Sequence, residues 1–287
     1  MTRSPDGSSA LEAGSNGRER PRLAVLIPVF NDQRGLEKAL ASLAQDGEQF
    51  DVFVVDDGSD PPISLPANLP YQAHLLRQEP NQGITAALNA GLPAICEAGY
   101  EYVARLDAGD LSLPGRFAAQ MLFLDDHPGH AAIGTATSYV DPGGNRLFDF
   151  HPPADHDALL RLYRYRSGIV HPSAMIRVAA LLACGFYREK FPGGEDYDLF
   201  MRLSETNKLG NLSSIFVVKE VRPGSITSRR LSVRISRVKL LRYYFDPTSI
   251  HSYLGIALNT VLMLAPVALV LKVRSLARAE AEAKETE

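Results

Sequence analysis

The sequence contains no tryptophan and only two cysteines among its 287 residues. Cys96 and Cys184 lie far apart, each in an apolar pattern typical of a helix. We therefore expect two reduced, buried thiols of the kind found in cytosolic proteins. No CxxC, HExxH or cluster of cysteine and histidine occurs. Neither a disulfide framework nor a zinc site is expected.

The chain also lacks a strong net charge and a secretory signal. With 30 basic and 33 acidic residues its formal net charge is −3, so we expect no nucleic acid partner. The composition is 45% hydrophobic and 22% charged, which is typical of a globular protein with one large α/β domain. The first twenty residues are polar and have no apolar core, so we expect residues 1–21 to form a disordered tail.

The first half of the chain alternates strand and helix patterns. Leu23–Phe30 and Phe50–Val55 are nearly continuous apolar runs, as expected for strands buried on both faces of a parallel sheet. A helical pattern follows the first run, whereas a Pro-rich loop and a short strand at Ala73–Arg77 follow the second. The turn at Pro80–Gly83 then leads into a second helical pattern, and a further strand ends at Asp107. This βαβαβ order predicts a doubly wound α/β sheet with ligands at the carboxyl ends of its strands. A dinucleotide-dependent enzyme is disfavoured, because no GxGxxG follows the first strand.

The second half changes character. Its patterns predict, in order, a strand pair at Ala131–Phe150, a helix at Asp155–Tyr165, a strand containing His171-Pro172-Ser173, a short helix near Val178–Cys184, and a strand at Leu212–Val221. There is no internal repeat.

Three acidic motifs follow a strand or open a helix: DDGS from Asp56, DAGD from Asp107, and GEDYD from Gly194. Carboxylates at strand ends suit a divalent cation, because Mg²⁺ and Mn²⁺ take oxygen ligands. Each motif also has a plainer interpretation, as an ordinary turn or as acidic residues that cap a helix. Their shared position favours function.

Together with PVFN at Pro28–Asn31, these motifs resemble those of family 2 glycosyltransferases of the GT-A fold. The resemblance covers roughly Leu23–Arg230 and implies a Rossmann-like, mostly parallel sheet flanked by helices, in a catalytic domain at residues 22–228. It also implies transfer of a sugar, with inversion, from a nucleotide-diphospho-sugar donor to a hydroxyl acceptor. The QxxRW motif of processive members is absent after Asp196, so a single addition is the better inference.

The resemblance implies a set of donor-binding residues. PVFN flanks the base and ribose, Asp56 accepts a hydrogen bond from the base edge with Asp57 beside it, and the loop after residue 221 closes over the diphosphate. The residues so implied are Pro28, Phe30, Asn31, Asp56, Asp57, Asn81, Gly83, Arg222 and Ser225. A buried strand end, a helix cap after Pro80 and a solvated arginine stay open as alternatives for PVFN, Asn81-Gly83 and Arg222.

The resemblance likewise implies a cation site and a general base. Asp107 is a ligand of Mg²⁺ or Mn²⁺, and Asp110 completes the site or holds the loop, while Gly109 replaces the second carboxylate of the commoner motif. Asp196 takes the proton of the acceptor hydroxyl, and Glu195 orients the acceptor. The missing carboxylate at Gly109 motivates an alternative function, a catalytically silent nucleotide-sugar-binding protein, against which Asp196 argues.

Residues 229–287 are not explained by the motifs. Leu254–Leu271 is an uncharged apolar stretch near the lower length limit for a membrane span, preceded by arginines that alternate with apolar residues. A helix packed on the domain is the alternative. Because nucleotide sugars are cytosolic, we expect an interfacial or re-entrant anchor on the cytoplasmic face of the inner membrane. The acceptor would be lipid-linked or a polysaccharide, in cell-surface glycan assembly.

Overall fold

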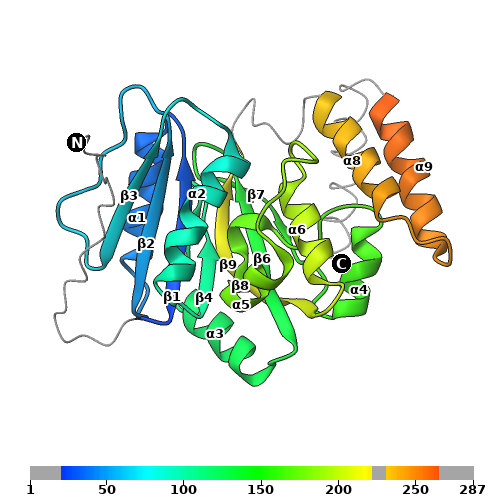
Figure 1. Ribbon diagram of the computed structural model, residues 1–287, viewed down its shortest axis with the longest axis horizontal. Helices are drawn as coiled ribbons and strands as arrows, with labels where there is room; N and C mark the ends of the chain where they lie inside the picture. The colour runs from blue at the N-terminus through cyan, green and yellow to red at the C-terminus, as the bar shows by residue number, and fades with distance from the viewer. Residues whose placement is uncertain (1–20, 222–230, 265–287) are drawn as a thin grey trace, which may run out of the picture.

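A computed structural model describes residues 21–221 and 231–264 of the chain. Nine strands within these ranges form one sheet in the order β3-β2-β1-β4-β8-β6-β9-β5, with β7 paired to β6 (Figure 1). The elements of the first half are β1 (Leu23–Val29), α1 (Gln33–Leu43), β2 (Phe50–Asp57), β3 (Gln72–Gln78), α2 (Ile84–Glu97), β4 (Tyr102–Arg105), β5 (Leu111–Ser112) and α3 (Arg116–Asp126). Those of the second half are β6 (His130–Val140), β7 (Arg146–Phe150), α4 (His156–Tyr163), the 3₁₀ turn η1 (His171–Ser173), β8 (Met175–Arg177), α5 (Val178–Cys184), α6 (Glu195–Leu203), β9 (Lys208–Glu220), α8 (Leu231–Tyr243) and α9 (Ile250–Leu264).

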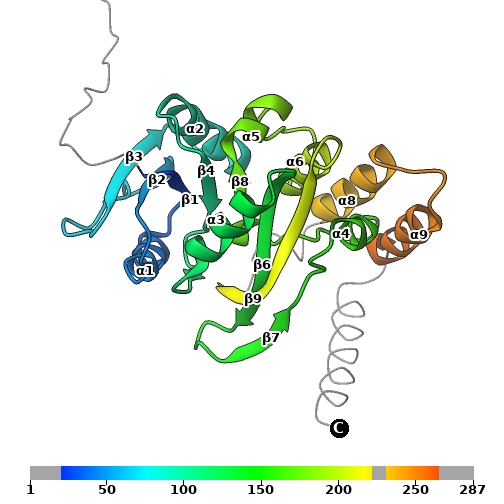
Figure 2. The same cartoon turned by 90° about the horizontal axis from the view of Figure 1, so that it is seen from below.

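The apolar run of β1 forms the centre of the parallel half of the sheet. β1 pairs in parallel with β2 on one side and with β4 on the other, and β3 extends this arrangement beyond β2. Successive residues of a strand face opposite sides, and β1 shows this directly. Leu26 packs with the α2 side chains in one core, whereas Val25 and Ile27 pack with α1 and α3 in the other. Helices therefore cover both faces (Figure 2), and the predicted α/β class is confirmed.

The other half of the sheet is mixed. β8 runs antiparallel to both β4 and β6, while β6 and β9 pair in parallel over most of their length. One sequence prediction is wrong here, because His171–Ser173 is a 3₁₀ turn and the strand begins only at Met175. Pro172 has no N–H to donate to a ladder, which favours the turn. Both cysteines are unpaired and half-buried rather than buried.

Two helices end the described chain. α8 adds Leu240 and Leu241 to the core that contains α4 and α6. α9 packs alongside α8 and lies at the opposite end of the molecule from β3 (Figure 1). Its approach to the end of α4 is close at Gly255, where an added Cβ would lie 1.8 Å from the carbonyl oxygen of Arg164. In the part of the chain that the structure describes, no helix combines the length and hydropathy required to cross a membrane. Residues 265–271 of the predicted anchor lie outside it.

Candidate active site

Strand register brings the motifs PVFN, DDGS and DAGD to one edge of the sheet. Val29, within PVFN, pairs with Asp56 of β2, and Leu26 pairs with Arg105, two residues before Asp107. Because β1, β2 and β4 are parallel, their carboxyl ends lie together, as expected for the ligand edge of a doubly wound sheet. The start of α6 also belongs to this region, since the negative charge of Asp107 contributes to raising the pKa of Asp196.

Asp56 is buried, and its carboxylate accepts hydrogen bonds from neighbouring loops and from β3. Its Oδ1 accepts a hydrogen bond from the backbone N–H of Ser59 at 2.9 Å, and its Oδ2 accepts bonds from Ile63 N at 3.2 Å and from the guanidinium of Arg77. Burial raises the pKa of Asp56, but these hydrogen bonds outweigh it and the net pKa is lowered. The side chain is fully buried, and both of its oxygens accept hydrogen bonds from within the protein. Its contact with the nucleotide base stays a prediction.

Asp57 links the DDGS turn to the segment before α2. Its carboxylate accepts hydrogen bonds from the side-chain amide of Asn81 at 2.9 Å and from the backbone N–H groups of Gln82 and Gly83, both at 2.8 Å. Gly58 has φ of +76°, and a Cβ there would lie 2.6 Å from the nitrogen of Asn81. Asp57, Asn81 and Gly83 are thus brought together, and their contacts hold two loops at the strand edge.

Phe30 and Asn31 extend from β1 at the same edge. The Phe30 side chain is 49% exposed, which is unusual for an aromatic that directly follows a buried strand. Asn31 has φ of +52°, and its Oδ1 accepts the backbone N–H of Asp60 at 2.8 Å. Pro28 is buried within β1. Arg222 and Ser225, the predicted diphosphate contacts, lie outside the described residues.

Asp107 and Asp110 share a lysine that the sequence analysis did not single out. Lys219, near the end of β9, places its Nζ 3.2 Å from Oδ2 of Asp107 and 2.7 Å from Oδ2 of Asp110. The other oxygen of Asp107 accepts a bond from the buried guanidinium of Arg105 at 2.8 Å. Burial lowers the pKa of Lys219, but the two carboxylates outweigh it and raise the net value.

The pKa values of the two aspartates shift in opposite directions. Burial raises the pKa of Asp107, but the charges of Lys219 and Arg105 lower it by more. The net pKa therefore lies well below the usual value. Of these two cations, Lys219 contacts Asp110 and Arg105 does not. Burial and the charge of Asp107 raise the pKa of Asp110. Asp107 is therefore the more strongly ionised carboxylate.

This donor set does not fit a divalent cation as it stands. Among residues 21–221 and 231–264, no group of three histidine, cysteine, aspartate or glutamate side chains is placed to hold a metal ion. The position between the two predicted ligands is taken by an ammonium. Gly109, with φ of +95°, supplies no side chain where a further carboxylate would be needed.

The two acids that open α6 are poorly solvated. Glu195 is 9% exposed, and its Oε2 accepts no hydrogen bond within the described part of the chain. Burial and the neighbouring charge of Asp196 raise the pKa of Glu195 to about 7. Burial also raises the pKa of Asp196, which is half-buried and accepts the backbone N–H of Tyr197 at 2.7 Å. A carboxylate with a raised pKa is a stronger base.

Asp198, the third acid of this motif, has a structural role. It is fully buried and accepts hydrogen bonds from Arg188 at 2.6 and 2.9 Å, from Arg202 at 2.9 Å and from the Tyr244 hydroxyl at 2.8 Å. These contacts connect α6 to the loop before it and to the residue after α8. They fix the start of α6, and with it Glu195 and Asp196.

Sequence reasoning missed two cations and a histidine contact. Lys219 and Arg105 each interrupt an apolar strand, and a charge at a buried strand position has to be paired, which is a signal that the sequence carried. His171 Nε2 lies 2.7 Å from the Tyr187 hydroxyl. Burial and the charge of Arg105 lower the pKa of His171 to about 3, so this ring is neutral at physiological pH.

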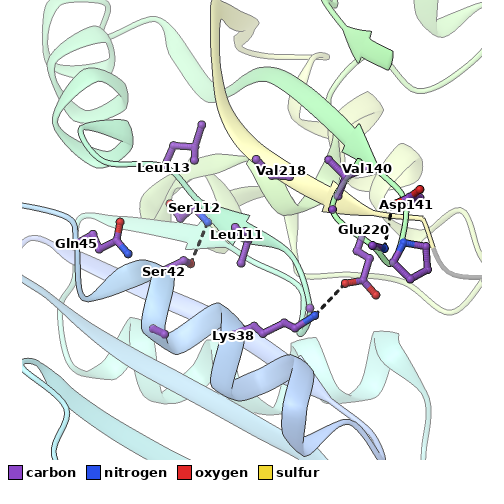
Figure 3. Close-up of a pocket in the computed structure, with 15 residues that line it drawn as sticks. Lys38, Ser42, Gln45, Leu111, Ser112, Leu113, Val140, Asp141, Val218 and Glu220 are labelled. Carbon is purple, nitrogen blue, oxygen red and sulfur yellow. Dashed lines mark hydrogen bonds and ion pairs between the residues drawn. The ribbon is translucent and has the colours of Figure 1, made fainter. Parts of the chain in front are cut away.

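A cavity of about 540 Å³ lies beside the cluster of Asp107, Asp110 and Lys219. Figure 3 shows the residues that line it. It is bounded by α1, by the segment from Gly109 to Leu113, and by the turn between β6 and β7. Lys38 and Glu220 form an ion pair of 3.1 Å across it. Its lining includes neither Asp107 nor Asp110, so the cavity is adjacent to the carboxylates and does not contain them.

Comparison with known proteins decides the family. The model of "Glycosyl transferase family 2" matches residues 24–184. The chain belongs to this family. The amylovoran biosynthesis glycosyltransferase AmsE of Erwinia amylovora is 29% identical over 233 residues, which are 76% of this chain and 85% of that protein. The protein is accordingly a glycosyltransferase, and its donor is a nucleotide sugar.

Two solved structures share the fold. A mannosyltransferase of Pyrobaculum calidifontis, in complex with GDP-Man and Mn²⁺, has a TM-score of 0.58 at 18% identity and covers 92% of this chain and 76% of its own. TarS of S. aureus, in complex with UDP, has a TM-score of 0.57 at 17% identity, with coverage of 83% and 70%. The predicted GT-A architecture is confirmed by these likenesses.

Proposed function

We propose that this family 2 enzyme is an inverting, non-processive glycosyltransferase that adds one sugar to a hydroxyl of a lipid-linked or polysaccharide acceptor. The proposal rests on one observation. Asp107, at the carboxyl edge of the sheet, lies near enough to the poorly solvated acids Glu195 and Asp196 at the start of α6 for its charge to raise their pKa values. A donor diphosphate needs a positive charge and an acceptor hydroxyl needs a base within one site. Asp107 and Asp110 hold a cation at this edge, the ammonium of Lys219, and the acids of α6 can take a proton.

Asp196 acts as the general base. The acceptor oxygen attacks the anomeric carbon from the face opposite the diphosphate, its proton passes to the Asp196 carboxylate, and the bond from that carbon to the diphosphate oxygen breaks. The nucleoside diphosphate leaves with the electron pair. Burial at the start of α6 raises the basicity of Asp196, and Glu195 beside it orients the acceptor.

The donor lies across the carboxyl edge of β1 and β2. Phe30 and Asn31 are the exposed residues there and face the base and ribose, while Asp56 and Asp57 hold the surrounding loops. Support for a nucleoside diphosphate comes from the two solved neighbours, which are in complex with UDP and with GDP-Man. Support for a glycan acceptor comes from the Erwinia relative, whose name assigns it to amylovoran biosynthesis.

The leaving diphosphate requires a positive charge. The family resemblance predicts Mg²⁺ or Mn²⁺ from Asp107 and Asp110, and GT-A enzymes commonly use such a cation, as in the mannosyltransferase with Mn²⁺. In this chain both carboxylates are already engaged by Lys219.

The α9 helix supports a location at a membrane surface. It carries no Asp, Glu, Lys or Arg, and it buries Ser252, Gly255 and Asn259 while most of its apolar side chains are exposed. The exposed ones are Ile250, Tyr253, Leu254, Leu258, Val261 and Leu264. This is the reverse of the pattern of a helix on a soluble domain. The neighbouring α8 exposes Lys239 and Arg242, which suit anionic lipid headgroups. We place this face on the cytoplasmic leaflet.

A nucleotide-sugar screen tests the enzymatic proposal. The full-length protein is incubated with a panel of UDP-, GDP- and dTDP-sugars, with EDTA and with Mn²⁺, and release of the nucleoside diphosphate is measured. We expect slow release from one donor even without acceptor, because water replaces the acceptor hydroxyl. Tight donor binding with no release from any donor, in the presence of lipid and glycan acceptors, would instead favour the silent nucleotide-sugar-binding protein.

A further inference from the structure

Lys219 lies between the two carboxylates that the family resemblance assigns to a divalent cation. Strand pairing fixes it there, because Val218 of β9 pairs with Leu111 of β5, directly after the loop that carries Asp107 and Asp110. The next residue of β9 therefore faces this loop. We propose that the ammonium of Lys219 takes the place of the divalent cation and binds the diphosphate of the donor.

The carboxylate oxygens are already occupied by fixed donors. Asp107 uses Oδ1 for Arg105 and Oδ2 for Lys219, and Asp110 accepts from Lys219 and from the backbone N–H of Glu220. A divalent ion would have to displace the ammonium from both aspartates or lie a few ångströms from it. Coulomb repulsion opposes the second arrangement, and loss of two charge-assisted contacts opposes the first.

The loop offers no replacement ligand. Gly109 occupies the position between the two aspartates, and its N–H donates to the carbonyl oxygen of Gly35 on α1 at 2.9 Å. Its φ of +95° is disfavoured for residues with a side chain. The loss of a carboxylate at Gly109 and the presence of a cation at Lys219 both lower the demand of this site for a metal ion.

Lys219 remains accessible to a ligand. Its side chain is 27% exposed and that of Asp107 is 33% exposed, so solvent and ligands can reach both groups. An ammonium has three N–H donors. Within the described residues Asp107 and Asp110 account for two of them, which leaves a third for a phosphate oxygen.

This inference rests on the proposed function, because it assigns the group that faces the leaving diphosphate. As the bond from the anomeric carbon to the diphosphate oxygen breaks, the electron pair leaves with that oxygen. A fixed ammonium offsets the added negative charge and keeps all of its protons. Donor binding should then need no divalent cation.

The test measures binding of UDP, GDP and dTDP to the full-length protein by isothermal titration calorimetry. The protein is first freed of metal with EDTA, and the titrations are repeated in excess Mn²⁺. We expect one of the three nucleotides to bind in EDTA with a Kd that Mn²⁺ leaves unchanged. These titrations need no variant, so they decide the question even if substitutions at Lys219 impair folding.

Two substitutions and a matched control locate the charge. Lys219→Met should weaken binding in EDTA by about 10- to 100-fold, the usual scale for a hydrogen bond to a charged group, whereas Lys219→Arg should retain most of it. Lys38→Met removes the same charge from the ion pair with Glu220, the next residue of β9, and should leave the Kd unchanged.

The possible results separate the two proposals. Binding that occurs only with Mn²⁺ and survives Lys219→Met would overturn the role of Lys219 and leave the proposed function standing. Absence of UDP, GDP and dTDP binding, both in EDTA and in Mn²⁺, would overturn the proposed function and this inference with it.

Discussion

The buried guanidinium of Arg105 donates a hydrogen bond from Nη2 to Oδ1 of Asp107, 2.8 Å away and two residues further along the chain. Arg105 is 1% exposed, and it also donates to the carbonyl oxygens of Leu26 and Leu106. One side chain thus ties the end of β4 to β1 and fixes the orientation of Asp107. The position of the Asp107 carboxylate depends on a cation inside the sheet.

Removing this cation should destabilise the fold. Arg105→Met leaves Asp107 without one partner and two contacts to backbone carbonyls unmade, and breaking a buried ion pair typically costs about 3 to 5 kcal/mol. Urea unfolding followed by circular dichroism measures the loss. Arg146→Met, which breaks the exposed pair with Asp149, is the control and should cost less than about 1 kcal/mol. Equal effects of the two substitutions would contradict the structural role of Arg105.

Removing the proposed general base should affect turnover and not donor binding. Asp196→Asn keeps the shape of the side chain but cannot take the proton, so we expect kcat to fall by about 10²- to 10⁴-fold. The Kd of the nucleoside diphosphate, measured by calorimetry, should stay near that of the wild type. Asp126→Asn, at the exposed end of α3, is the control with unchanged kcat. Near-normal turnover of Asp196→Asn would remove this residue from the mechanism.

The raised pKa of Glu195 should make the stability of the protein depend on pH. Its pKa rises from 4.5 to about 7 on folding, because burial and Asp196 disfavour the charged form. The folded state therefore binds the proton more tightly than the unfolded state, and stability falls as pH rises from 4.5 to 7. A carboxylate this buried contributes a loss on the order of 1 to 3 kcal/mol.

Glu195→Gln should remove that loss. We expect the variant to be more stable than the wild type at pH 8 and equally stable at pH 4.5, in urea unfolding at the two pH values. Glu205→Gln, exposed in the turn after α6, provides the comparison and should show no such difference. A variant that gains nothing at pH 8 would mean that Glu195 is better solvated than its burial indicates.

The sequence predicted the elements whose evidence is local. The apolar run at Leu23–Phe30 became β1, and the helical spacing after Gly83 became α2. β2 runs two residues further than predicted, because Asp56 and Asp57 stay paired with Arg77 and Gln78 of β3 even though their side chains favour turns. Backbone pairing outweighed local preference there.

The cation of the site could not be predicted in the same way. Lys219 is 109 residues from Asp110 in sequence, and only the pairing of β9 with β5 brings them together. A lysine near the end of an apolar strand signals a buried partner but does not name it. The acidic motifs were visible because each is contiguous, whereas the cluster that they form is not.

The outward-facing apolar side of α9 leads to the last prediction. Leu258 and Val261 are 48% and 64% exposed, so Leu258→Glu with Val261→Glu should leave the fold intact. Burying one such side chain contributes about 1.5 to 3 kcal/mol, and the double variant should bind membranes at least about tenfold more weakly. Flotation with phosphatidylcholine vesicles containing phosphatidylglycerol measures this binding. Leu122→Glu, equally exposed on α3, is the control and should float as the wild type does. A wild type that stays with the soluble fraction would refute membrane binding, and a double variant that floats normally would exclude α9 as the contact surface.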